Sequence, residues 1–276
     1  MTTVEFQEYL RSLLDSQKYK RWQECYTETD ATSRDRAKSS QKSAREIDFQ
    51  LMAELWQPSK QSPQQMSEKG EREEKVEKLP VLEALQKYAP EQVLLVGRPG
   101  SGKSTTLERL LWQQAKAALA DRALQIPVLI ELRSYKSSTL ESIQGFFAEY
   151  GLELSPADIE ELLTDKKLLL LFDGLNELPN EEARNEVTRF RKEYPTAAIF
   201  TTRELSAGGN LGIEKRLEMQ PLSDEQIEEF VLAYLPDTGK ALLAKLDRRL
   251  ADIRRTPLFL WILCEVFQQF GKVPED

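Results

Sequence analysis

A glycine-rich stretch with one lysine and three hydroxyl residues carries the clearest chemistry in the sequence. Residues 97–105 read GRPGSGKST and fit the pattern G-x-x-x-x-G-K-[S/T]. Glycines let the backbone bend so that successive N–H groups face a phosphate, and a helix that follows adds the positive end of its dipole. The alternative is an ordinary glycine-rich turn, but an apolar run before the motif and a helical pattern after it favour a phosphate-binding loop.

Each position in this loop has an expected role. Lys103 supplies a positive charge to the β- and γ-phosphates, and the Ser104 hydroxyl ligates Mg²⁺. The backbone N–H of Thr105 is placed to meet the α-phosphate. The remaining expected nucleotide contacts are Gly97, Arg98, Pro99, Gly100, Ser101 and Gly102. We therefore expect the chain to bind ATP or ADP together with Mg²⁺.

Two carboxylates follow an apolar run farther along the chain. Asp173 comes directly after the run 168–172, and Glu177 lies in the loop that follows. Because ligands of open α/β sheets bind at the carboxyl ends of strands, we expect Asp173 to hold Mg²⁺ through water, opposite Ser104. We expect Glu177 to orient or deprotonate the attacking water. The alternative is that both acids only end a strand and begin a loop.

Arg203 follows a further apolar run, 197–201. An arginine at this edge of the sheet can sense the γ-phosphate and stabilise charge on it in the transition state. An ordinary surface arginine or an ion-pair partner is the alternative. The residues that we expect to act on the reaction are thus Lys103, Glu177 and Arg203.

The composition excludes several other kinds of chemistry. The 276 residues contain no histidine, which removes Ser-His and Cys-His nucleophiles and the commonest zinc ligand. Cys25 and Cys264 lie far apart, so neither a disulfide framework nor a zinc site is indicated. The net charge of −8 argues against direct nucleic-acid binding. Neither a membrane span nor a signal peptide is indicated, so a cytoplasmic protein is expected.

Five apolar runs predict the strands of a parallel sheet, because such runs are typical of strands that are buried on both faces. They lie at 92–97, 126–132, 168–172 and 197–201, with a weaker fifth at 216–219. Helical patterns fall between them, at 104–120, 138–149, 155–163 and 180–193. This alternation predicts an α/β P-loop NTPase fold with a five-stranded parallel sheet and flanking helices.

The composition also divides the chain into three regions. Residues 1–79 are polar and helix-prone, with helices expected at Val4–Lys18 and Ser43–Leu55 and a polar linker at 57–78. Residues 80–220 form the expected nucleotide-binding domain. Residues 221–276 show helical patterns alone, at 223–235, 239–253 and 257–270, and Ser223 with Gln226 predicts a capping box for the first of these.

The motifs GRPGSGKST, IPVLIELRSY, LLLLFDGLNEL, IFTTRE and RTPLFLWILC, in this order, resemble those of the NACHT family, signal-transduction NTPases of the STAND class related to AAA+ proteins. The resemblance covers about residues 80–270. It implies that Asp173 is the Walker B acid and that Arg203 is the sensor 1 arginine. It also implies that Pro257 touches adenine and reports the state of the nucleotide, and that the source is bacterial.

The chain departs from the family pattern at Asn176, where members often carry a second acid. Asparagine can hold water but cannot act as a base, so Glu177 carries more of the hydrolytic role and slow turnover is expected. Members usually continue into a winged helix and sensor repeats. The resemblance therefore implies that residues 1–276 are the N-terminal part of a longer protein.

Several functions fit these observations. The first is a signalling switch, for defence or signal transduction, that self-associates on ATP binding and acts on an unknown effector or adaptor protein. The second is a nucleotide-binding adaptor with negligible hydrolysis, which Asn176 favours. A metabolic P-loop kinase is weakened by the lack of an acceptor-binding lid motif, and a GTPase by the lack of an N-K-x-D motif.

Overall fold

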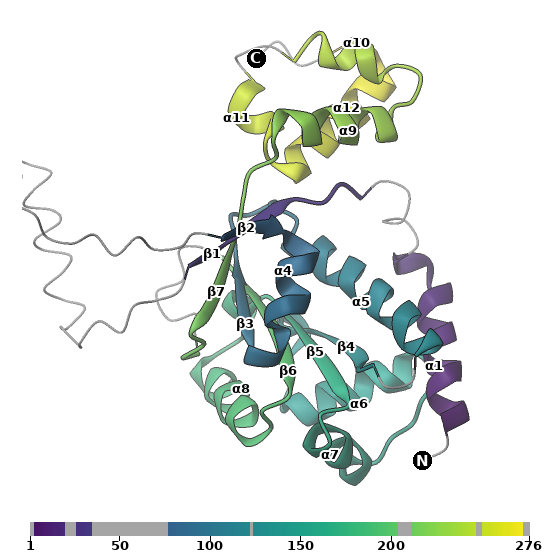
Figure 1. The fold of residues 1–276 in the computed structure, drawn as a ribbon, viewed down its shortest axis with the longest axis vertical. Coiled ribbons are helices and arrows are strands. Elements are labelled where there is room, and N and C mark those ends of the chain that lie inside the picture. The colour runs from purple at the N-terminus through teal and green to yellow at the C-terminus, as the bar shows by residue number, and fades with distance from the viewer. Residues whose placement is uncertain are drawn as a thin grey trace, which may run out of the picture.

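The computed structural model describes residues 3–19, 26–34, 77–121, 124–203, 211–246 and 250–272. A seven-stranded sheet lies at its centre, in the order β2-β1-β7-β3-β6-β5-β4 (Figure 1). The five parallel strands are β3 (Val93–Val96), β4 (Ile126–Glu131), β5 (Leu168–Asp173), β6 (Ala197–Thr202) and β7 (Lys215–Met219). These are the five strands that the apolar runs predict, and the α/β P-loop NTPase fold is confirmed.

The central strands are buried along nearly their whole length. Every residue of β3 and β6 is buried, and β5 is buried up to its last residue, Asp173. Between β5 and β6, the rings of Phe172 and Phe200 stack at 4.5 Å. Helices cover both faces of the sheet, which explains why these strands are apolar throughout rather than alternating.

The sheet has two strands more than the five expected. β1 (Asp30–Arg34) pairs antiparallel with β7 on one side and with β2 (Glu77–Pro80) on the other. Both additional strands are short and polar, reading DATSR and EKLP. No apolar run marks such strands at the edge of a sheet, because the pairing of β1 with β7 and of β2 with β1, rather than their own hydrophobicity, sets their place.

The helices of the central region begin and end within about one residue of the expected positions. They are α5 (Lys103–Ala120), α6 (Thr139–Glu149), α7 (Pro156–Thr164) and α8 (Glu181–Glu193). The sequence patterns did not indicate α4 (Val81–Tyr88) or the short 3-10 helix η1 (Ala89–Glu91) that follows it. Further 3-10 helices follow β4 and β5, namely η2 (Leu132–Ser134) and η3 (Leu175–Glu177).

The first helix, α1 (Thr3–Asp15), lies beside α5 and shares the main hydrophobic core with the sheet (Figure 1). Tyr9 and Leu13 are fully buried. The Tyr9 hydroxyl donates to the Pro127 carbonyl at 2.8 Å, and its ring lies 4.9 Å from that of Phe147. The expected helix at Ser43–Leu55 and linker residues 57–76 lie outside the described residues, and residues 77–78 begin β2.

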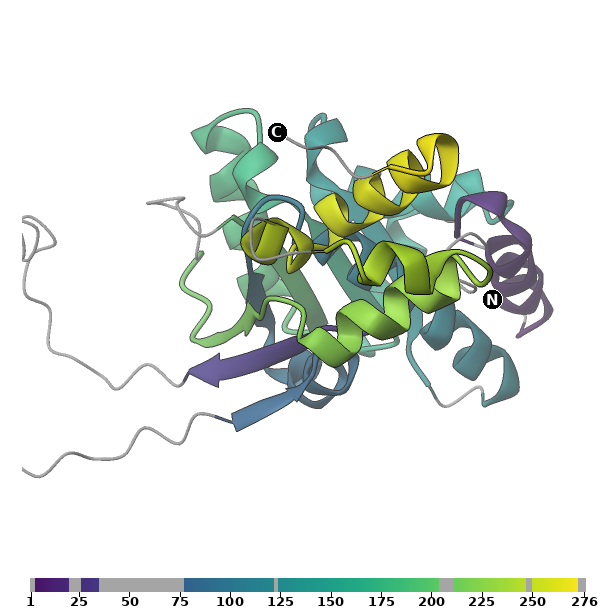
Figure 2. The ribbon, with the colours of Figure 1, turned by 90° about the horizontal axis from the view of Figure 1, so that it is seen from above.

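Four helices form a lid with its own small hydrophobic core, above the end of the sheet where the parallel strands finish (Figures 1 and 2). They are α9 (Asp224–Tyr234), α10 (Gly239–Leu243), α11 (Ala251–Arg254) and α12 (Pro257–Phe270). The capping box of Ser223 and Gln226 is present, and Gly271 ends α12 in the left-handed conformation with φ 66°.

The single helix expected over 239–253 is wrong, because α10 ends at Leu243 and α11 begins at Ala251. After the break the chain turns so that Leu246 is buried in the lid core. The Leu246 carbonyl accepts a hydrogen bond from Arg254 Nη1 at 3.2 Å. A carbonyl inside a regular helix would instead accept from the backbone N–H four residues later. In the described part of the chain, no helix is long and apolar enough to cross a membrane.

Candidate functional site

The loop between β3 and α5 has the backbone conformation that a phosphate cradle needs. Gly100 and Gly102 adopt φ values of 76° and 91°, a region that side chains with a Cβ rarely occupy. A Cβ at Gly97 would lie 2.7 Å from Ser101 Oγ. Gly102 is the N-cap of α5, so the loop delivers its N–H groups to the positive end of a long helix.

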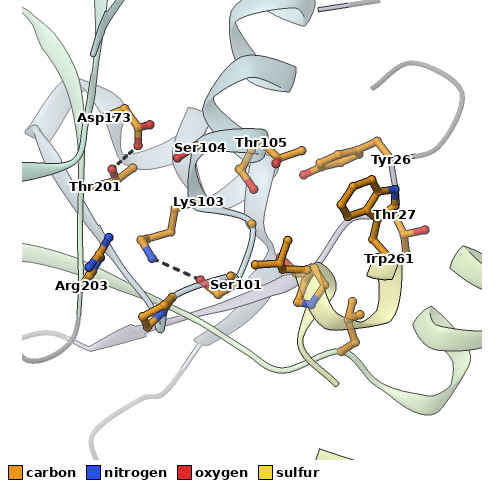
Figure 3. Close-up of a pocket in the computed structure, with 18 of the residues that line it drawn as sticks. Tyr26, Thr27, Ser101, Lys103, Ser104, Thr105, Asp173, Thr201, Arg203 and Trp261 are labelled. Carbon is orange, nitrogen blue, oxygen red and sulfur yellow. Dashed lines mark hydrogen bonds between the residues drawn. The ribbon is translucent and has the colours of Figure 1, made fainter. Parts of the chain in front are cut away.

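Lys103 reaches back over this loop. Its ammonium donates to the carbonyls of Gly97 at 2.6 Å and Arg98 at 3.0 Å, and it lies 3.5 Å from Ser101 Oγ (Figure 3). The charge is thus held in the concave side of the loop, beside the N–H groups of the glycine-rich turn. Phosphate oxygens that enter the loop would meet this cation and the helix dipole together.

Asp173 lies at the carboxyl end of β5 and lines the same pocket as the first turn of α5. Thr201 of β6 donates its hydroxyl proton to Asp173 Oδ1 at 2.7 Å and accepts from the Gly174 N–H at 2.8 Å. Because Thr201 is completely buried, this relay fixes the orientation of the carboxylate. Figure 3 shows Asp173 and Ser104 lining the same side of the pocket, from the strand and from the helix respectively.

Glu177 and Arg203 form an ion pair at the same edge of the sheet. Glu177 Oε1 and Arg203 Nη2 are 3.5 Å apart, with the side chains 37% and 54% exposed. Asn176 Oδ1 accepts from the Arg203 backbone N–H at 3.1 Å. Asn176, at the position where the family often has a second acid, therefore joins the loop after β5 to the end of β6. This contact holds the backbone of Arg203 beside the pocket.

A third carboxylate, Glu131, lies beside Asp173 in the register of β4 and β5. Lys18 and Arg133 each contact it at 2.7 Å. Burial alone would raise the pKa of Glu131, but the hydrogen bonds and charges of Lys18 and Arg133 outweigh it, so the pKa is lowered. Glu131 is therefore ionised at neutral pH, and its negative charge is neutralised by the ion pairs with Lys18 and Arg133.

A cavity of about 470 Å³ joins the phosphate loop, the sheet edge and the lid. The N–H of Leu258, in the first turn of α12, donates to the Gly100 carbonyl at 3.2 Å. A Cβ on Gly100 would lie 3.0 Å from Leu258 Cβ, and one on Gly102 would lie 3.9 Å from Pro257 Cγ. The lid thus rests directly on the phosphate loop.

The structure brings all the predicted site residues except Gly97 and Arg98 into the walls of this cavity. Those that line it are Pro99, Gly100, Ser101, Gly102, Lys103, Ser104, Thr105, Asp173, Glu177, Arg203 and Pro257. Gly97 and Arg98 bear the carbonyls that hold Lys103. Residues from distant parts of the sequence, brought together only by folding, thus surround one space of a size that suits a nucleotide.

Sequence reasoning missed the apolar end of the cavity, which is lined by Tyr26, Thr27, Thr29, Leu222, Phe230, Tyr234 and Trp261. Trp261 Nε1 donates to the Tyr234 hydroxyl at 2.9 Å. One signal was available, because Trp261 follows Pro257 by four residues and hence falls on the same face of α12. Tyr26 and its neighbours belong to no motif and reach the cavity through the pairing of β1.

Comparison with known proteins agrees with this geometry. Residues 91–238, more than half of the 276-residue chain, match the NACHT domain family. The chain belongs to the NACHT family. As a NACHT protein it is a P-loop NTPase, and nucleotide binding and hydrolysis are the general activities of such proteins.

Two further similarities accompany this NACHT match. An uncharacterized WD repeat-containing protein of Nostoc sp. (strain PCC 7120) is 24% identical over 219 residues, which is 66% of this chain and 14% of that protein. A solved structure of Drosophila ORC bound to DNA has 15% sequence identity and a TM-score of 0.45, covering 84% of this chain and 71% of that chain. The NACHT chain thus spans a small part of the length of the curated relative.

The polar residues of the site fit Mg²⁺ that is bound together with a nucleotide. Within the residues that the structure describes, no group of three His, Cys, Asp or Glu side chains could hold a metal by itself. Mg²⁺ keeps several waters and usually takes one or two protein oxygens together with phosphate oxygens. Ser104 and the oriented carboxylate of Asp173 suffice for such a site, in which the NACHT protein supplies few ligands.

Proposed function

We propose that this NACHT chain is a nucleotide-dependent signalling switch that binds Mg²⁺-ATP between the sheet edge and the lid and hydrolyses it slowly. The observation that carries the proposal is the hydrogen bond from the Leu258 N–H to the Gly100 carbonyl. The same loop would contact the phosphates and the lid, so a change at the phosphates has a direct path to α12. This is the coupling that a switch needs.

In the proposed site, the phosphates lie in the loop from Gly97 to Gly102, with Lys103 at the β- and γ-phosphates and Thr105 near the α-phosphate. Ser104 and Asp173 would hold Mg²⁺, which supplies charge neutralisation when bound. The Glu177–Arg203 pair faces the γ-phosphate end. A γ-phosphate competes for Arg203, which leaves the Glu177 carboxylate to orient the attacking water.

The base would occupy the aromatic end of the cavity. Tyr26 and Trp261 approach this end from the N-terminal segment and from the lid respectively (Figure 3). Apolar and aromatic walls are typical of sites that bury a ring, because a flat π-system stacks on such side chains. Pro257 lines the same cavity close to Gly102 of the loop, where it would contact the base of the nucleotide.

A nucleotide-binding adaptor with negligible hydrolysis is the second candidate. Asn176 favours it, because its side chain holds the Arg203 backbone and cannot serve as a base. The two candidates share the binding site and differ only in turnover. Phosphate release with excess Mg²⁺-ATP separates them, since the adaptor would release no more phosphate than Lys103→Ala.

The wider role is proposed on the family resemblance and on the lid contact together. ATP binding would promote self-association and transmit a signal to an effector or adaptor protein, in defence or signal transduction in the cytoplasm. The curated relative shares only the region matched by this chain, so its repeats give no information about the activating signal.

The decisive experiment is nucleotide binding to Lys103→Ala, measured by titration calorimetry with Mg²⁺-ATP. We expect binding to be lost, because the loop loses the cation held at its centre. Lys116→Gln is the matched control, since it removes an exposed lysine from the same helix α5 and should leave the affinity unchanged. Wild-type affinity in Lys103→Ala would refute the phosphate loop.

A further inference from the structure

Arg109 connects the helix after the phosphate loop to the aromatic end of the cavity. Its guanidinium carbon lies 5.6 Å from the centre of the Tyr26 ring and 5.2 Å from that of Trp112. Both distances fall within the range of cation–π attraction, which is stronger when the cation is shielded from water. Tyr26 lines the cavity and Arg109 does not, so Arg109 can act on a ligand only through Tyr26.

The placement of Arg109 on α5 is dictated by the helix repeat. Thr105 and Thr106 line the cavity, and Arg109 follows them by four and three residues, which puts it one turn farther along the same face. Nε of Arg109 and Nε1 of Trp112 are buried and have no hydrogen-bond partner within the residues that the structure describes. The rings of Tyr26 and Trp112 therefore hold the Arg109 guanidinium beside the cavity wall.

Tyr26 packs against the edge of the main hydrophobic core and precedes β1, so it reaches the cavity from outside the parallel strands. Two hydrogen bonds of Glu28 hold the backbone that follows Tyr26. The Glu28 carboxylate accepts from the Leu82 N–H at 2.9 Å, and the Glu28 carbonyl accepts from Gln226 Nε2 of the lid at 2.8 Å. These bonds place the chain, whereas Arg109 contacts the ring itself.

We infer that Arg109 is a positioning residue for the nucleobase, because it fixes the Tyr26 ring in the wall of the cavity where the base of a nucleotide would stack. The inference rests on the proposed nucleotide site and adds a residue to it. Stacking is tolerant of ring identity, so the ligand class is a nucleoside di- or triphosphate with a planar base. Arg109 thus contributes to the affinity for the base and leaves the affinity for the phosphates unchanged.

The test compares two ligands in the presence of Mg²⁺, ATP and inorganic tripolyphosphate, by titration calorimetry. We expect Arg109→Gln to weaken ATP binding about 2- to 30-fold, the range that corresponds to one cation–π contact. Tripolyphosphate binding should stay within about twofold of wild type, which also shows that the variant is folded. Lys116→Gln is the matched control, because Lys116 lies 5.2 Å from the Trp112 ring centre without contacting Tyr26.

A double substitution tests whether Arg109 acts through Tyr26. Tyr26→Ala should weaken ATP binding, and Arg109→Gln in that background should add no further loss, since the two residues form one unit. Equal losses for ATP and tripolyphosphate in Arg109→Gln, or full additivity with Tyr26→Ala, would overturn the inference. Equal wild-type affinity for the two ligands would overturn it too while leaving the phosphate loop intact. Binding of neither ligand would overturn the proposed function and this inference together.

Discussion

Glu177 and Arg203 hold opposite charges 3.5 Å apart at the end of the cavity beside Asp173. Their pairing has two consequences for a bound triphosphate. The pair is partly exposed, so its own strength is modest and a phosphate group can displace the carboxylate from Arg203. Once displaced, the carboxylate would lie close to the phosphate and could orient a water.

We predict that Glu177→Gln keeps Mg²⁺-ATP binding within about twofold but lowers phosphate release by about 10²- to 10⁴-fold, the usual contribution of a general base. Binding persists because the loop and Lys103 are unchanged. Steady-state phosphate release and calorimetry measure the two quantities. Glu181→Gln, which changes a carboxylate that is 81% exposed on α8, should alter neither. Unchanged turnover in Glu177→Gln would move the catalytic role to another residue.

At the scale of elements, local signals predicted most of the helices and long-range contacts decided the rest. Ser155, Asn180 and Ser223 each cap a helix through the side-chain bond that their residue types favour. β1 and β2 carry no comparable local signal, because these polar strands form only by hydrogen bonding to the strand beside them. The break between α10 and α11 likewise follows from packing in the lid core and not from helix propensity.

The candidate site divides in the same way. Its phosphate half lies within contiguous motifs around Lys103 and Asp173, where residue spacing in one strand or loop determines the geometry. Its aromatic half is assembled from Tyr26 on the N-terminal segment and Phe230 and Trp261 on the lid. These come together only through the pairing of β1 with β7 and the docking of α12, which no pattern along the chain encodes.

The contact between the N-terminal segment and β4 predicts a dependence of stability on pH. The pKa of Glu131 is lowered in the folded chain, although burial opposes this, because Lys18 and Arg133 bind the carboxylate. A carboxylate with a lowered pKa stabilises the fold above its unfolded pKa, and this contribution disappears as the pH falls through the folded value. We expect Glu131→Gln to cost about 1 kcal/mol at pH 7.

The same substitution should cost less at pH 3 than at pH 7, because the charge contributes less once the pH is below the unfolded pKa of a glutamate, and nothing once it is below the lowered pKa of folded Glu131. Thermal unfolding of wild type and Glu131→Gln at the two pH values measures the difference. Glu160→Gln serves as a control, because it removes an exposed carboxylate on α7, away from Lys18 and Arg133. An equal loss at both pH values would show that Glu131 acts by packing and not by charge.

At the scale of the whole molecule, two hydrogen bonds among the described residues join the lid to the nucleotide-binding core, in addition to the chain that leads from β7 into α9. The Leu258 N–H binds the Gly100 carbonyl on the phosphate loop, and Gln226 Nε2 binds the Glu28 carbonyl on the N-terminal segment. Between these points lies the cavity itself. A ligand that fills the cavity therefore contacts all three parts and can change how the lid sits on the loop.

We predict that Mg²⁺-ATP and Mg²⁺-ADP produce different association states, measured as mass by light scattering. Only ATP carries a γ-phosphate. That group would compete with Glu177 for Arg203. It would also act on the phosphate loop, whose Gly100 carbonyl accepts from the Leu258 N–H of the lid. ADP leaves both contacts in place. We therefore expect a larger mass with ATP, and the clearest difference in Glu177→Gln, which should retain ATP because its turnover is slowed.

Lys103→Ala provides the control for this experiment, because it should keep the mass of the ADP-bound protein at any ATP concentration. A rise in mass for Lys103→Ala would mean that ATP acts outside the phosphate loop. The same mass with both nucleotides, in wild type and in Glu177→Gln, would count against the switch for residues 1–276. Nucleotide binding by the loop would be untouched by that result, because calorimetry measures it independently of association. The mass measurement therefore tests whether a change in the lid leads to self-association, and calorimetry tests separately whether the loop binds the nucleotide.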